Sequence, residues 1–254
     1  MTDLTPAQYA LAETATDAFK RGVAARQAND LAAARQAWAL AAAAYDELIS
    51  DGATQFRPDL ADTLMGWGNA LQSSGDLPGA LTRYAQAKTA YDELIDDGAT
   101  QFRPNRAKTL MNWGVALASS GDLPGALARF AEAKTAYDEL IGEGSMQFRA
   151  NRAVTLMNWG NVLQSIGDRF GALARYAEAL DVWAALLREK QRQHADNVLT
   201  AVTNQLLCAQ QQAREGHRLD AVQTLVMFEA MKAQVGEVTT AVLALAKSHQ
   251  PLAR

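Results

Sequence analysis

The sequence predicts an all-α protein made of tandem helix pairs, and three observations carry that prediction. The segment Tyr-Asp-Glu-Leu-Ile occurs from Tyr45, Tyr91 and Tyr137, at a spacing of 46 residues. Apolar residues recur at steps of three and four, which is the spacing of one helical face. Gly-Asp pairs interrupt this pattern at regular intervals, where a glycine can end one helix and an aspartate can begin the next. A repeating unit of two helices accounts for all three observations.

The repeats differ in how closely they match one another. Residues 51–96 and 97–142 are identical at 36 of 46 positions, which indicates a recent duplication. The neighbouring segments are more divergent, as terminal repeats commonly are because one of their faces is solvated. We expect a single domain spanning residues 1–254, with five units and a C-terminal capping helix: about 5–50, 51–96, 97–142, 143–188 and 189–236, then the helix at about 237–249.

Residues 51–96 show how one unit is built. Its first helix is predicted by an apolar stripe: Leu60, Leu64, Trp67 and Leu71. Gly75 can take the left-handed conformation that ends this helix, and Asp76 can cap the next one. Pro78 then falls in a first turn, where a missing N–H costs nothing. The second helix carries a stripe at the same spacing: Ala80, Tyr84, Ala87, Tyr91 and Leu94.

The tryptophans of the first helices are expected to be packing residues. Each should bury most of its ring between the two helices of its own pair. The expected contacts are Trp67 with Ala80, Trp113 with Ala126 and Trp159 with Ala172.

These positions resemble the tetratricopeptide repeat family. Its helix pair has spaced apolar residues, a glycine, a Gly-Asp turn, and then alanine, an aromatic residue and alanine. Here they are Leu110, Trp113, Gly114, Gly121, Asp122, Ala126, Phe130 and Ala133, and likewise Leu156, Trp159, Gly160, Gly167, Asp168, Ala172, Tyr176 and Ala179. The period of 46 exceeds the usual one of about 34. Residues 58–64 are similar to the longer repeat of kinesin light chains. The resemblance implies a right-handed superhelical solenoid that binds proteins.

The same resemblance implies that the first helices line a concave groove. The face opposite the tryptophans would form it, with the candidate partner-binding residues Met65, Asn69, Gln72, Lys108, Met111, Asn112, Met157, Asn158, Asn161 and Gln164. Methionine suits adaptable apolar contacts, and an amide can bond a peptide backbone as donor and acceptor. Alternatively, the methionines are core between neighbouring pairs and the asparagines are solvated residues without a role.

A second candidate surface is the repeated segment Gln-Phe-Arg, which ends at Arg57, Arg103 and Arg149. These arginines would form an edge able to meet an acidic partner. The interpretation we favour is structural: each phenylalanine covers the end of a second helix, and each arginine pairs with a nearby Asp or Glu.

The sequence predicts neither an enzyme nor a metal or cofactor site. His194, His217 and His249 lie far apart without partners at ligand spacing, and Cys208 falls on an inward stripe. The net charge of −4 and pI near 5.4 argue against nucleic-acid binding. No apolar stretch is long enough for membrane insertion, and the first residues do not read as a signal peptide, so we expect a cytoplasmic protein.

The expected function is a non-catalytic scaffold or adaptor that binds a protein or peptide partner in a neutral groove. Two alternatives stay open. One is a structural protein that self-associates as a homo-oligomer or decorates a cytoskeletal polymer. The other is a regulatory subunit of a larger enzyme complex.

Overall fold

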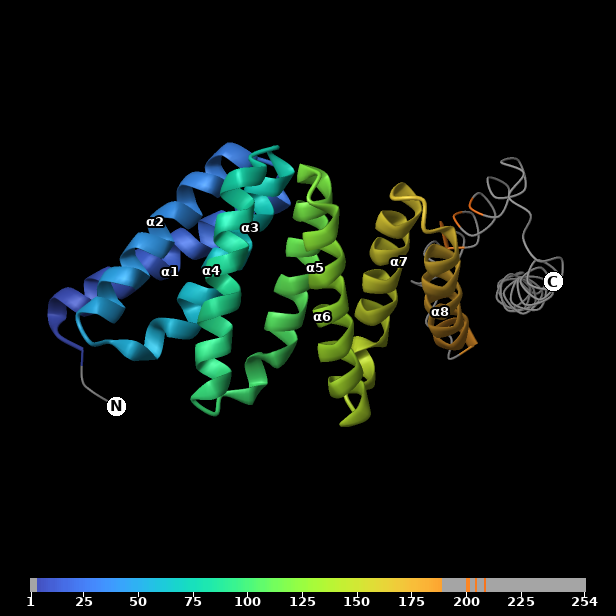
Figure 1. Cartoon of the computed structure of the whole chain (residues 1–254). Coiled ribbons are helices and arrows are strands. Elements are labelled where there is room, and N and C mark those ends of the chain that lie inside the picture. The colour runs from blue at the N-terminus through green and yellow to red at the C-terminus, as the bar shows by residue number, and fades with distance from the viewer. Residues whose placement is uncertain (1–3, 189–199, 202–203, 205–207, 209–254) are drawn as a thin grey trace, which may run out of the picture. The chain divides into compact units, whose positions relative to one another are not determined.

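The prediction of an all-α fold is confirmed. The structure is a computed structural model that describes residues 4–188, 200–201, 204 and 208, and all its regular elements in this part of the chain are helices (Figure 1). The α-helices are α1 (Pro6–Gln27), α2 (Leu31–Ser50), α3 (Arg57–Ser73), α4 (Leu77–Asp96), α5 (Arg103–Ser120), α6 (Leu123–Gly142), α7 (Arg149–Ser165) and α8 (Arg169–Arg188). A single 3₁₀ turn precedes each of α3, α5 and α7.

The helices are arranged in consecutive pairs. Helix α1 packs on α2, α3 on α4, and α7 on α8. Helices α3, α5 and α7 begin 46 residues apart, as the sequence repeat predicts. The contacts divide the described residues into two compact units, with the boundary between Ala136 and Tyr137, inside α6. The expected fifth unit lies outside the described residues apart from positions 200, 201, 204 and 208, and the capping helix and the three histidines lie outside them entirely.

The turn inside each pair has the predicted chemistry. Gly75 has a φ of +82°, the left-handed conformation that ends a helix at low cost in glycine. The Asp76 carboxylate accepts a hydrogen bond from the Gly79 backbone N–H at 3.0 Å and so caps α4. The same bond joins Asp122 to Gly125, and Asp168 to Gly171.

A glycine allows the two helices of a pair to approach each other. A Cβ atom added to Gly68 would lie 2.8 Å from the ring of Tyr84, which is fully buried on α4. Gly114 stands in the same relation to Phe130. The contact between α2 and α3 is also close, because a Cβ atom at Gly66 would lie 3.1 Å from the Trp38 indole.

The tryptophans of the first helices pack differently from the expectation. Trp67 does pack against the cluster that contains Ala80, but it is only partly buried, and the Arg83 guanidinium lies over its ring at 3.9 Å from the centroid. Trp113 packs against the same cluster, which includes Tyr84 of α4, so it joins its own pair to the preceding one. The fully buried aromatic residues are instead those of the second helices.

In the first unit, the first helices approach each other more closely than the second helices do. Helix α3 contacts both α1 and α5, whereas α2 and α4 make no comparable contact with each other. This arrangement agrees with an inner layer of first helices. It also leaves space between α2 and α4.

Candidate functional site

The methionines of the expected groove are buried to different degrees. Met157 is buried, with 6% of its surface exposed. Met65 is partly buried and packs against the cluster of α3 and α4 that contains Leu64 and Tyr91. Met111 is also partly buried. Of the ten candidate residues, only Lys108 and Asn161 are exposed. The interpretation of Met157 as a core residue is therefore the correct one.

The amides of the first unit form an internal network. The Tyr84 hydroxyl lies 2.8 Å from Asn69 Oδ1 and 2.7 Å from Gln72 Oε1. A hydroxyl has one proton to donate, and Asn69 Oδ1 accepts it. Gln72 completes the network when its NH₂ group, instead of its oxygen, faces the Tyr84 hydroxyl. Asn112 Nδ2 donates to the same Asn69 oxygen at 2.8 Å, which links α5 to α3.

The second unit repeats this arrangement. The Tyr176 hydroxyl lies 2.8 Å from Asn161 Oδ1 and 2.9 Å from Gln164 Oε1. Asn204 Nδ2 donates to the same Asn161 oxygen at 3.1 Å. The network was not predicted, although the sequence contains its signal. Where the third repeat has Phe130 instead of tyrosine, it also has Val115 and Ala118 instead of the two amides.

Asn112 is a candidate partner-binding residue whose NH₂ group is already used in an internal hydrogen bond. The remaining polar atoms of the pair, Asn69 Nδ2 and Asn112 Oδ1, have no hydrogen-bond partner and are not buried. Together they present one donor and one acceptor on adjacent first helices. Asn158 is half-buried and makes no hydrogen bond within the described part of the chain.

The Gln-Phe-Arg segments make internal contacts of the kind that a structural role requires. Phe56 stacks on Tyr45 at a centroid distance of 5.9 Å, and the equivalent pairs further along are Phe102–Tyr91 and Phe148–Tyr137, each at 6.2 Å. Arg57 pairs with Asp97 at 2.6 Å and with Glu93 at 3.3 Å. The hydrogen bond to Asp97 is the main reason why the pKa of Arg57 is raised. Arg149 donates to the Met146 carbonyl, and Arg103 also has an interaction partner.

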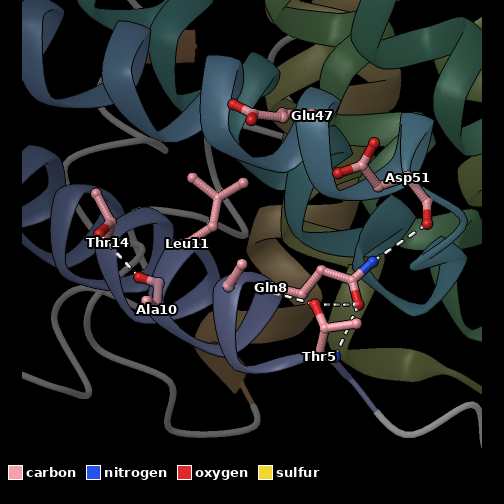
Figure 2. A pocket seen from close by; sticks show the side chains of 8 residues that line it. Thr5, Gln8, Ala10, Leu11, Thr14, Glu47 and Asp51 are labelled. Atoms are coloured by element: carbon pink, nitrogen blue, oxygen red, sulfur yellow. Dashed lines mark hydrogen bonds between the residues drawn. The ribbon is translucent and has the colours of Figure 1, made fainter.

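A cleft of about 660 Å³ lies between α1 and α2 (Figure 2). Figure 2 shows Gln8 bridging its two sides, with its Nε2 donating to the Asp51 carbonyl at 3.1 Å. Leu11 occupies the position that Arg57 has in the next repeat, so Glu47 and Asp51 lack the ion pairs that Arg57 makes there.

The described residues contain no cluster of three or more His, Cys, Asp or Glu side chains that could hold a metal ion. Cys208 is fully buried, as expected, and burial raises the pKa of its thiol, which disfavours the reactive thiolate. None of the helices in the described ranges is both long and apolar enough to cross a membrane.

Comparisons with known proteins agree with this architecture. No protein-family model matches the chain, and no curated protein sequence matches it. Among solved structures, the chain is similar to MamA protein, with a TM-score of 0.51 and 16% identity, over 95% of this chain and 99% of that one. It is also similar to BtubC (BKLC) from P. vanneervenii, with a TM-score of 0.53 and 14% identity, over 96% of this chain and 95% of that one. At these identities the likeness concerns the fold, which is an all-α helical-repeat solenoid.

Proposed function

We propose that this protein is a non-catalytic, cytoplasmic scaffold that binds a segment of a partner protein along its first helices. Stacked helical repeats present extended surfaces of this kind, which supports the proposal at the level of the fold. The buried thiol of Cys208, with its raised pKa, is a poor nucleophile and supports a role without catalysis.

The observation that carries the proposal is the Asn69–Asn112 pair. Their hydrogen bond fixes the orientation of both amides, and it leaves Nδ2 of one and Oδ1 of the other available to solvent. A donor and an acceptor side by side match the C=O and N–H groups of an extended peptide backbone. Because the two amides are already held in place, binding does not have to order them.

The partner segment that this surface fits is lightly charged. The candidate residues carry a single charged side chain, Lys108, among the amides and methionines. Binding should then depend weakly on salt, since screening acts on charges.

The test uses the protein that co-purifies from a native lysate, purified and titrated calorimetrically against the full chain. Asn158→Ala removes an amide without an internal hydrogen bond, so it should leave the fold unchanged and weaken binding by about fivefold, the value of one backbone hydrogen bond. A second variant replaces Asn69, Gln72 and Tyr84 by Val, Ala and Phe, the set that the third repeat uses. It should fold normally and bind more weakly than Asn158→Ala. Unchanged affinity in both variants, or a steep fall with salt, would contradict the proposed surface.

A further inference from the structure

A groove of about 570 Å³ runs between α2 and α4, the second helices of the first two pairs. Its floor is apolar and comes from Leu60, Leu64 and Trp67 of α3. Its walls consist mainly of small side chains, including Ala43 on α2 and Ala85 on α4. Leu60 and Trp67 are only partly buried, so the floor can be reached from solvent.

In the later repeats, the position of Leu60 holds an arginine. Arg106 of α5 is bonded to Asp92 of α4. In the second unit, Arg152 of α7 bridges Asp138 of α6 and Glu178 of α8, and only 16% of its side chain is exposed. There the arginine spans the space from one second helix to the next and neutralises the carboxylates on both sides.

The groove between α2 and α4 has the equivalent aspartate but lacks the equivalent arginine. Asp46 of α2 corresponds to Asp92 and Asp138, and Gln86 of α4 corresponds to Glu178. With Leu60 in place of the arginine, the exposed carboxylate of Asp46 has no hydrogen bond or ion pair within the described residues.

The other charged residues that line the groove are already engaged. Arg83 donates to Gln86 at 2.7 Å and covers Trp67. Glu93 pairs with Arg57. Arg83 is held by the neutral Gln86 and by the Trp67 ring, so Asp46 is the carboxylate that an incoming cation would find unpaired, beside an apolar floor.

We propose that this α2–α4 groove is a second binding site, which takes a segment of a partner protein carrying an arginine or lysine next to an apolar side chain. The cation lies between Asp46 and Gln86, as Arg152 lies between Asp138 and Glu178, and the apolar neighbour packs on Leu60. Arginine is favoured over lysine because its planar guanidinium can bond both wall residues at once.

The dimensions of the groove favour a polypeptide over a small cation. Ala39 and Asp46 mark its extent along α2, a length of about 10 Å at the helical rise per residue. That length matches about three residues of extended chain. The site is independent of the proposed first-helix surface, because it lies between second helices, so either proposal can fail without the other.

The test selects a phage-displayed library of random peptides on the full-length protein, with the Leu60→Arg variant as counter-selection. Leu60→Arg restores the arginine of the later repeats and should fill the groove from within. The enriched peptides should carry arginine or lysine beside Leu, Met or Phe. A fluorescent copy of the strongest peptide should lose detectable binding to Leu60→Arg, and circular dichroism checks that this variant folds.

The exposed residue Asp46 gives a variant that does not disturb the core. Asp46→Asn should weaken binding of the peptide about tenfold, as expected for loss of a charge-assisted contact in an apolar setting. Asp96→Asn is the matched control, since it removes the same charge from an exposed side chain outside the groove, and it should bind as the wild type does. Failure to enrich any peptide over Leu60→Arg would overturn the proposal, and so would equal losses in Asp46→Asn and Asp96→Asn.

Discussion

Tyr84 and Phe130 differ by one oxygen atom, and two further substitutions accompany that difference. The hydroxyl of Tyr84 is bonded to Asn69 and Gln72, whereas the third repeat places Val115 and Ala118 at those two positions. A half-buried amide without a partner is costly, so the three residues change together. Although the two repeats are nearly identical, Asn69, Gln72 and Tyr84 therefore form a coupled set on α3 and α4.

This coupling predicts that Tyr84→Phe alone lowers the free energy of unfolding by about 1–2 kcal/mol, because it leaves Asn69 and Gln72 without their hydroxyl partner. The triple variant, with Asn69→Val and Gln72→Ala added, should recover most of that loss. Urea denaturation of the single, double and triple variants measures the coupling energy. If the three single effects simply add, the residues are not coupled.

Gly114 predicts a second effect at the residue scale. A Cβ atom there would lie 2.7 Å from the Phe130 ring, which is 1% exposed and has no room to move. Gly114→Ala should destabilise the protein by about 1–3 kcal/mol through overpacking. Gly142→Ala is the control, because no atom lies within 4 Å of its Cβ position. The control should match or exceed wild-type stability in the same denaturation assay.

At the scale of the helices, local sequence signals predict the helix pairs, but the sequence does not reveal contacts between residues far apart in the chain. The Gly75-Asp76 turn and the apolar stripes act within a few residues, so the sequence predicts the helix pairs well. The bonding of Asn112 to Asn69 joins residues 43 positions apart, and no periodicity reveals it. The sequence also did not predict the contact of Arg83 with the Trp67 ring, because a charged residue on a helix surface is normally expected to face solvent.

Trp113 connects helices of different pairs through apolar contacts. It packs from α5 against the cluster of Ala80 and Tyr84 on α4, and the Arg129 guanidinium lies over its ring at 4.8 Å from the centroid. Trp113→Ala should cost about 3 kcal/mol, the lower end of the range for an aromatic residue lost from a core, since the ring is partly exposed. The denaturation midpoint measures this cost. Arg129→Ala should cost about 1 kcal/mol, since the cation over the ring is partly exposed and its ion pair with Glu132 is lost as well.

At the scale of the whole molecule, buried tyrosines make stability depend on alkaline pH. Burial raises the pKa values of Tyr84, Tyr91, Tyr137 and Tyr176 well above their ordinary value of 10.0. In the unfolded chain these hydroxyls ionise near pH 10, while in the folded chain they stay protonated. Their contribution is therefore fully present below about pH 10 and is lost as the pH rises toward the folded-state values.

Unfolding free energies should fall as the pH rises above 10, with a slope that approaches about 1.4 kcal/mol per pH unit above about pH 11 for each tyrosine that remains protonated in the folded state. Tyr137→Phe should reduce the slope by one such contribution. Equal slopes for wild type and Tyr137→Phe would mean that Tyr137 ionises in the folded protein.

The close contact of Trp38 with Gly66 restricts how this protein can gain or lose repeats during evolution. Recombination between near-identical repeats would readily delete residues 51–96, and the coding frame would survive. The shortened protein would bring Asn112 to the place of Gly66, where even a Cβ atom would lie 3.1 Å from the indole. Asn112 would also meet Val23 where Asn69 had accepted its hydrogen bond. Two repeats that are nearly identical in sequence therefore cannot replace each other, because each fits the repeat that precedes it. The order of the repeats is under selection for this reason.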